Sequence, residues 1–226
     1  MHAAPGSRRQ VPRSLTYDPK LAAMLSNPVA EIETLRGATL GSIATPRSLP
    51  AGGAVALFGT GKLSTTFDLV AEITLPAGKP VAFGLAVLAS SAGGPGAGVD
   101  INVPNVVAGV LLHINVSAPD QATGARTVDV SASVPHATAV GFNNSHSFQH
   151  PDAAAIELRV LVDRMMVEAF VGGGRGVVTT PVLLPGKDPL AGGAFLFSPG
   201  YAESAVDIAS ATAWEMGCGW ASYPYQ

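Results

Sequence analysis

The sequence predicts an all-β fold: a two-sheet antiparallel β-sandwich of about a dozen short strands, preceded by a short linker helix. Beyond residue 37, apolar and polar residues alternate with a period of two, which is the pattern of strands with one buried face. The 26 glycines and 18 prolines cluster between these runs, where turns need positive or fixed φ angles. No repeat of roughly 20–50 residues is visible, so neither a propeller nor a solenoid is predicted.

One short helix is predicted near the start of the chain, in SNPVAEIETLRG. Asn27 can cap its first turn, Pro28 suits the first helical position, and Gly37 can end it. The apolar residues at helical spacing are Val29, Ile32 and Leu35. The residues ahead of this helix are too few to form a core, so we expect residues 1–36 to pack on the sandwich or to belong to a larger unit.

Three stretches show strand alternation most clearly. In TFDLVAEITL, residues 66–75, the apolar side chains share one face and Asp68 lies on the other. VLLHINVS at 110–117 and RTVDVSASV at 126–134 repeat this pattern, with His113 on the polar face of the first. Each strand is therefore expected to have one buried face and one face in water.

Composition and charge argue against several partners. The net charge is -3 and no five like charges adjoin, so we predict no binding to nucleic acid and none to a membrane surface. No stretch reaches the roughly 18 apolar residues of a membrane span, and the N-terminus lacks the apolar core of a secretory signal. The single cysteine, Cys218, excludes a disulfide within the chain and any multi-cysteine metal site, and no cofactor is predicted.

Two motifs suggest a ligand, but neither fits its pattern. AVALFGTGKLST has Ala56 and Leu63 where a phosphate-binding loop needs Gly and Ser or Thr, and it leads into a strand, so nucleotide binding is not predicted. NNSHSFQHPD places His146 and His150 four residues apart. This segment is polar, ends at Pro151 and has the composition of a loop, so no metal site is predicted.

The stretch IELRVLVDRMMVEAFVGGGRG, residues 156–176, is predicted to form two strands joined by a tight turn, and it carries two carboxylates that could suggest a hydrolase. No G-x-S-x-G motif occurs, so a serine hydrolase is not predicted. A glycosidase needs two carboxylates about 5–10 Å apart in a pocket, and Asp163 and Glu168 are the available pair. The alternation turns them away from the core, where arginines of the same stretch are expected to bind them. These arginines are Arg159, Arg164 and Arg175. We therefore predict a structural role and no catalytic residue.

The stretch LRVLVDRMMVEAFVGGGRGVVTTPVLLP resembles the C-terminal β-sandwich domain of glycoside hydrolase family 32, the invertase, inulinase and fructosyltransferase group. The family pattern runs L-R-[IV]-[LF]-V-D-x-S-x-[VI]-E-x-F, then a turn and G-x-x-x-[IV]-T, and Met165 replaces its usual Ser. The positions in register are Leu158, Arg159, Val162, Asp163, Val167, Glu168, Phe170, Gly174, Arg175 and Thr179. VPRSLTYDPKLAAMLSNPVAEIETLRG resembles the end of the family's catalytic propeller with its linker helix, and ATAWEM resembles its closing strand.

This resemblance implies a domain division and a missing partner. Residues 1–36 would be the propeller end and linker helix, residues 37–216 the sandwich, and residues 217–226 a C-terminal tail. The family's catalytic motifs, similar to W-M-N-D-P-N-G, R-D-P and E-C, lie on an N-terminal five-bladed β-propeller and are absent from this sequence. The chain is therefore expected to lack the catalytic carboxylates and to be inactive alone. The family-motif residues expected to be structural are Arg159, Asp163, Glu168, Phe170 and Arg175.

By the same resemblance, the intact enzyme would be a retaining β-fructosidase that acts on sucrose or fructans through a covalent fructosyl-enzyme. This chain would be its non-catalytic module, extracellular or vacuolar by family analogy. A truncated gene model, in which residue 1 is not the true start of the protein, would explain the missing part. The alternative is a stand-alone, lectin-like carbohydrate-binding sandwich. Because aromatic residues make up only 6% of the chain, Trp214 and Trp220 are the best candidates for stacking on a sugar.

Overall fold

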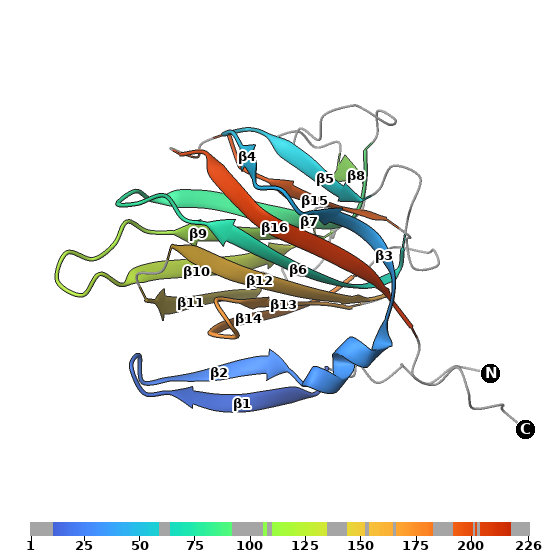
Figure 1. Ribbon diagram of the computed structural model, residues 1–226, viewed down its shortest axis with the longest axis horizontal. Helices are drawn as coiled ribbons and strands as arrows, with labels where there is room; N and C mark the ends of the chain where they lie inside the picture. The colour runs from blue at the N-terminus through green and yellow to red at the C-terminus, as the bar shows by residue number, and fades with distance from the viewer. Residues whose placement is uncertain are drawn as a thin grey trace, which may run out of the picture.

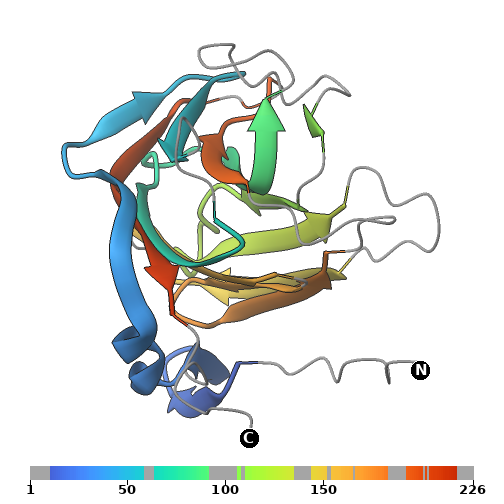
Figure 2. The ribbon, with the colours of Figure 1, turned by 90° about the vertical axis from the view of Figure 1, so that its right-hand side faces the viewer.

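The computed structural model describes residues 11–58, 64–91, 106–107, 110–134, 144–151, 154–164, 166–182, 192–200, 202 and 204–217. Within these ranges the chain confirms the predicted all-β sandwich. Two seven-stranded antiparallel sheets lie face to face, with a separate two-stranded hairpin beside them (Figure 1 and Figure 2). No helix in the described part is long and apolar enough to cross a membrane.

The first sheet, called sheet I below, has the strand order β11-β10-β9-β7-β15-β5, with β8 beside β7. Its strands are β5 (Ala54–Phe58), β7 (Val81–Ser91), β8 (Val106–Val107), β9 (Val110–Val116), β10 (Arg126–Ser133), β11 (Asn144–His150) and β15 (Gly193–Phe197). Sheet II has the order β14-β13-β12-β6-β16-β3, with β4 beside β16. Its strands are β3 (Arg36–Ile43), β4 (Arg47–Leu49), β6 (Thr66–Thr74), β12 (Ala155–Asp163), β13 (Met166–Val171), β14 (Gly176–Pro181) and β16 (Val206–Met216).

The core lies between the two sheets and is built from the apolar sides of the alternating strands. On β6, Phe67, Leu69 and Ile73 are at most 1% exposed, as the alternation predicts. Strand β12 adds Ile156 and Val160, which are also buried, and the antiparallel register places Leu69 opposite Val160. These side chains of sheet II belong to one core cluster with Phe83 and Ile114 of sheet I, and burial of this shared layer is the main favourable term that holds the two sheets together.

The prediction that every strand has one face in water is wrong for two strands of sheet I. Residues 81–89 of β7 and all of β15 are buried, because a second apolar cluster lies on the outer face of this sheet. Its buried members are Ala86, Ala89, Phe195 and Phe197. Gly84 makes room for the cluster, since a Cβ there would lie 2.4 Å from the Phe197 ring and 2.2 Å from the Leu112 carbonyl oxygen.

The N-terminal segment forms a hairpin of β1 (Arg13–Asp18) and β2 (Ala23–Pro28), followed by the 3₁₀ helix η1 (Ala30–Leu35). The predicted short helix is therefore present, but it is of the 3₁₀ type and starts later, because Asn27 and Pro28 pair with β1 as part of β2. The hairpin lies below β13 and β14 in Figure 1 and bonds to the turn between them. This segment thus packs on the outer face of sheet II.

Candidate functional site: two buried carboxylates on sheet II

Two carboxylates are buried on the outer face of sheet II, the face that points away from the core. The strand register places Asp68 of β6, Leu161 of β12, Glu168 of β13 and Thr179 of β14 in one row across the sheet. The side chains of Asp68 and Glu168 are 0% and 1% exposed. A buried carboxylate needs charged or hydrogen-bonding partners, and both carboxylates find some of theirs in the N-terminal segment.

Glu168 binds the start of β1. One of its oxygens accepts a hydrogen bond from the Val11 backbone N–H at 2.7 Å, and the other accepts one from Arg13 Nη2 at 2.5 Å. The Thr179 hydroxyl also donates to Glu168, at 3.2 Å. The Arg13 guanidinium lies over the Phe170 ring, 5.3 Å from its centre, within the range of a cation–π contact. Glu168 therefore anchors the start of β1 to the sheet through charge and hydrogen bonds, and Phe170 adds an aromatic contact.

Asp68 joins the linker to the sheet through two arginines. Arg159 donates from Nε and Nη2 at 3.1 and 2.8 Å, which is a bidentate pair, and Arg36 donates from Nε at 2.8 Å. Glu33 of η1 accepts a hydrogen bond from Arg159 at 3.2 Å and lies 3.3 Å from Arg36. The Arg36 guanidinium also covers the Trp214 ring, 4.1 Å from its centre. This network fixes η1 and the start of β3 against sheet II.

The glycine turn between β13 and β14 holds β2. Gly172, Gly173 and Gly174 have φ angles of 63°, 67° and 81°, which residues with a side chain rarely adopt. A Cβ on Gly174 would lie 2.5 Å from Asn27 Oδ1, so glycine also permits the close approach of β2. In return, the Ser26 N–H donates to the Gly174 carbonyl at 2.9 Å, and Asn27 Nδ2 donates to the Gly173 carbonyl at 3.0 Å.

Arg175, directly after this turn, holds the far end of β1. It donates to Asp18 at 2.5 Å and to the Gly172 carbonyl at 2.7 Å. The hydrogen bond from Arg175 lowers the pKa of the Asp18 carboxyl below its usual value, although desolvation opposes this. β1 is thus attached near both of its ends, at Arg13 and at Asp18.

We expected the arginines of the 156–176 stretch to bind the carboxylates of the same stretch on an open surface. This expectation is wrong about which residues pair. Asp163 is exposed, whereas Glu168 is buried and paired with Arg13. Arg159 and Arg175 bind acidic residues from elsewhere in the chain. The predicted tight turn itself is present, and Arg164 occupies it with a positive φ of 45°.

Sequence reasoning missed the partners that make this site. Arg13 lies 155 positions from Glu168 and Arg36 lies 32 positions from Asp68, so no local pattern could pair them. The available signal was the resemblance itself, because both arginines fall in the VPRS to LRG stretch that resembles the family's linker region.

The geometry of this row supports a structural role. Asp68 and Glu168 are two strand spacings apart, roughly 10 Å, which a pair of catalytic carboxylates could use. However, Leu161 lies between them in the row and is 5% exposed, and each carboxylate oxygen already accepts a hydrogen bond. The arrangement can neutralise buried charge and tie distant segments together, but it leaves no open oxygen for a substrate.

The two histidines of the rejected metal motif lie on strand β11, so the loop prediction is wrong. His146 pairs with Val130 and His150 with Arg126, because this polar segment is the edge strand of sheet I. Four residues of a strand span roughly 13 Å, too far for two rings to share an ion. His150 is 5% exposed, and burial lowers the pKa of its imidazole. In the described residues, no group of three or more His, Cys, Asp and Glu could hold a metal ion.

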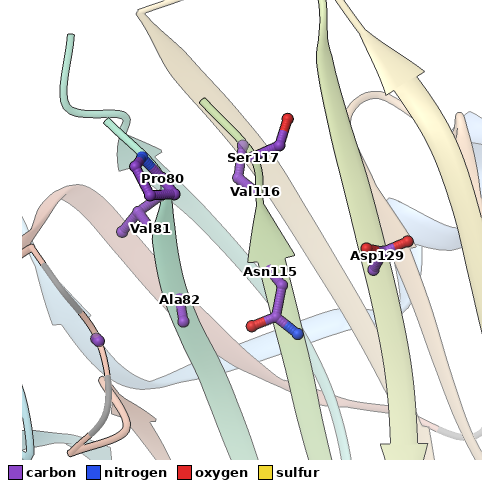
Figure 3. Close-up of a pocket in the computed structure, with 8 residues that line it drawn as sticks. Pro80, Val81, Ala82, Asn115, Val116, Ser117 and Asp129 are labelled. Atoms are coloured by element: carbon purple, nitrogen blue, oxygen red, sulfur yellow. The ribbon is translucent and has the colours of Figure 1, made fainter. Parts of the chain in front are cut away.

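A shallow hollow of about 260 Å³ lies on the outer face of sheet I (Figure 3). Asn115 of β9 and Asp129 of β10 stand opposite each other in the strand register, with Ala82 of β7 on the other side of Asn115. None of its described lining residues is aromatic. The hollow could offer hydrogen bonds to a polar ligand but no ring to stack on.

Of the two residues predicted to stack on a sugar, the structure describes Trp214, on β16 of sheet II. Arg36 covers one face of the Trp214 ring. Four residues named from the sequence lie outside the described residues, namely Leu63, Met165, Cys218 and Trp220.

Comparison with known proteins gives one family and one fold. The family described as "Glycosyl hydrolases family 32 C terminal" matches residues 31–215. Fructan 1-exohydrolase IIa from Cichorium intybus is similar in structure with a TM-score of 0.67 and 18% identity, over 91% of this chain and 40% of its own. Exo-inulinase from Aspergillus awamori gives a TM-score of 0.54 and 18% identity, over 92% of this chain and 35% of its own.

A third structure, fructofuranosidase from Schwanniomyces occidentalis, gives a TM-score of 0.54 and 14% identity, over 91% of this chain and 40% of its own. No curated protein sequence matches the chain. At these identities the structures show a shared fold, and this chain spans 35% to 40% of their length. The match over residues 31–215 confirms the resemblance and shows that the chain belongs to the C-terminal domain family of the family 32 glycosyl hydrolases.

Proposed function

We propose that this chain is a non-catalytic β-sandwich module that stabilises the catalytic domain of a family 32 glycoside hydrolase. The proposal rests on one observation: the carboxylates of Asp68 and Glu168 are buried, and each is paired with at least one arginine. A glycosidase acid must exchange its proton with the substrate, and a nucleophile must reach a sugar carbon. Carboxylates enclosed in this way serve to hold the fold.

The N-terminal segment supports the stabilising role. The hairpin β1–β2 precedes the residues that match the family, yet it is tied to them at Glu168, at the glycine turn and, through the linker, at Asp68. A module that precedes this segment would therefore be joined to the sandwich through a fixed linker. Each Å² of apolar surface buried between the two would contribute roughly 25 cal/mol.

The family resemblance supports a proposal for the activity of the complete enzyme. It would be β-fructofuranosidase-like, hydrolysing or transferring fructosyl units of sucrose or a fructan with retention, and its catalytic β-propeller would be the partner of this chain. The relatives named fructan 1-exohydrolase, exo-inulinase and fructofuranosidase support this substrate class.

The test is a fructose-release assay on the purified chain. We expect no fructose from sucrose or inulin under conditions in which the Aspergillus awamori exo-inulinase converts inulin readily. A mock purification from the same host controls for contaminating invertase. Release above that control would contradict the proposal.

Carbohydrate binding is the second candidate function, and the hollow at Asn115 and Asp129 is the observation that favours it. An amide and a carboxylate side by side can donate to and accept from neighbouring sugar hydroxyls. Titration calorimetry with sucrose, inulin and levan tests this role. Heat of binding that disappears in Asp129→Ala would support it, and no heat, or heat unchanged in that variant, would count against it.

A further inference from the structure

A buried histidine of sheet I lies against the glycine turn that holds β2. His150, at the end of the edge strand β11, is 5% exposed. A Cβ on Gly172 would lie 3.2 Å from His150 Nδ1 and 2.9 Å from the Phe148 ring, so both side chains of β11 pack on the backbone of this turn. β11 also adjoins β14, where the edges of the two sheets meet (Figure 1). The imidazole therefore joins the edge of sheet I to the turn on sheet II.

The site fits the neutral imidazole and has no place for a second proton. Nε2 of His150 lies 3.3 Å from the Ala155 carbonyl oxygen, which can only accept, so Nε2 carries the proton of the neutral ring. Nδ1 is buried and has no hydrogen-bond partner among the described residues. A proton on Nδ1 would therefore be a buried donor without an acceptor, and it would bring a buried charge with it.

The charged groups around the ring also oppose its protonation. Arg126 lies beside His150 in the register of β10 and β11 and is 2% exposed, and Arg175 follows the glycine turn. Burial is the largest cause that lowers the pKa of the His150 imidazole, and the charges of Arg175 and Arg126 lower it further. The start of β12 contributes the uncharged Ala155 carbonyl, whose hydrogen bond acts in the opposite direction. The neighbouring charges thus favour the neutral ring.

We propose that His150 is a pH-sensitive latch, in which the neutral ring keeps the glycine turn closed on β2 and the protonated ring opens it. A charged imidazole must reach water, so it leaves Gly172, and the turn loses the side chain that packs on its backbone. The opened turn then frees β2, whose Ser26 N–H donates to the Gly174 carbonyl at 2.9 Å in the closed state. In mild acid the hairpin is therefore held less firmly on the sandwich.

The latch acts on the side of the hairpin that faces the sandwich. Its contacts do not depend on what covers the other side of the hairpin, and the proposal is independent of the proposed function. Asp18 and Arg175 hold the far end of β1, and the hydrogen bond from Arg175 lowers the pKa of the Asp18 carboxyl below 3.8. This ion pair persists in mild acid, so protonation of His150 loosens the turn and leaves that end of the hairpin attached.

The pH range of the latch follows from proton linkage. The closed turn holds the pKa of His150 below the ordinary value of 6.5, so the open turn binds the proton more readily. The closed turn is fully favoured above about pH 6.5. Below it, opening becomes up to about tenfold more frequent for each pH unit, until the ring is protonated in the closed turn as well.

Hydrogen exchange at the Ser26 amide of the full chain, corrected for the intrinsic exchange rate at each pH, tests this proposal. We expect protection of this amide to be constant above about pH 6.5 and to fall by up to about tenfold per pH unit below it. His150→Gln should remove the pH dependence, because its amide can still donate to the Ala155 carbonyl but cannot titrate. The Arg164 amide, which donates to the Thr65 carbonyl at the opposite end of β12, is the internal control and should show no such change.

His146→Gln is the matched control variant and should behave like the unchanged chain, because His146 is an exposed histidine on the same strand. An NMR titration of the His150 ring in the unchanged chain needs no substitution, and protonation of the ring should coincide with the loss of Ser26 protection. Protection that stays constant as the pH falls overturns the proposal, and so does a fall that persists in His150→Gln. If His150→Gln loses Ser26 protection already at neutral pH, the unchanged chain decides. A ring that titrates there without any change at Ser26 overturns the latch.

Discussion

Asp68 and Asp129 lie in similar local sequence patterns but in opposite surroundings. Each lies on an alternating strand at a position that points away from the core, Asp68 on β6 of sheet II and Asp129 on β10 of sheet I. Asp68 is 0% exposed and is bound by two arginines, whereas Asp129 is exposed beside the hollow. The alternation of apolar and polar residues thus predicts which side of the sheet a residue faces. Whether that side is exposed to solvent depends on the distant segment of residues 11–36, which covers part of sheet II.

The two sheets also differ in how they satisfy a buried charge. In sheet I, Arg126 is 2% exposed and donates to the backbone carbonyls of Pro76 at 2.8 Å and Lys79 at 3.0 Å, so it closes the loops at its own end of the sheet. In sheet II, the buried charges are carboxylates that bind arginines, including one from β1 and one at the start of β3. In sheet I the buried charge of Arg126 orders the loop that it bonds to. In sheet II the buried carboxylates attach the N-terminal segment.

The largest expected effect is a loss of stability when the carboxylate of Asp68 is removed. Asp68→Ala should lower the free energy of unfolding by about 3–5 kcal/mol, because it leaves Arg159 and Arg36 partly buried without their shared partner. Asp129→Ala should change it by no more than about 0.5 kcal/mol, because this side chain faces water. Urea denaturation of both variants measures the difference, and equal effects would show that the burial contrast between the sheets has no energetic consequence.

Much of the fold could be predicted from the sequence because most strands obey the period of two. The predicted strands at 66–75, 110–117 and 126–134 are confirmed as β6, β9 and β10. The prediction failed at β11, because an edge strand with only one neighbour can remain polar along most of its length and then has the composition of a loop. Periodicity identifies strands that are half-buried, and it fails at a sheet edge.

The candidate site was less predictable, because its partners are distant in sequence. The local pattern placed Glu168 and Arg159 away from the core, which the structure confirms through their register on sheet II. It could not show that Arg13 would cover Glu168 or that Arg159 would turn to Asp68, since these contacts span 155 and 91 positions. The identity of a salt-bridge partner depends on the packing of elements, and local periodicity carries no information about it.

A smaller and more local effect is expected at Glu168. Glu168→Gln keeps the size of the side chain but removes its charge, so the contact with Arg13 should weaken by about 1–3 kcal/mol. Glu157→Gln is the control, because Glu157 is an exposed glutamate on the neighbouring strand β12. Hydrogen exchange should speed up at the Ser26 amide, which donates to Gly174, while the amides of β6 keep their protection. If β6 loses protection to the same degree, the hairpin is part of the sandwich's cooperative unit and not a separately attached element.

The smallest expected effects are those of pH, and they fall in separate ranges for the two sheets. Burial lowers the pKa of His113 and of His150 on sheet I below the ordinary value of 6.5, so the unfolded chain takes up these protons first as the pH falls. Stability from this source is complete above about pH 6.5 and declines below it. The hydrogen bond from Arg175 lowers the pKa of Asp18 below 3.8, so the contribution of that carboxyl is complete above this value and is lost only as the pH falls further.

Urea midpoints measured from neutral pH downward should therefore show two declines, the first from the histidines of sheet I and the second from the hairpin on sheet II. His150→Gln should reduce the first decline and leave the second unchanged, because burial lowers the pKa of the His150 imidazole and a glutamine side chain does not titrate. Asp18→Asn should remove part of the second decline only, because the amide cannot titrate. A first decline that is unchanged in both His150→Gln and His113→Gln would mean that other groups titrate in that range. The link between the histidines of sheet I and acid sensitivity would then be wrong, even if the hairpin responded as expected.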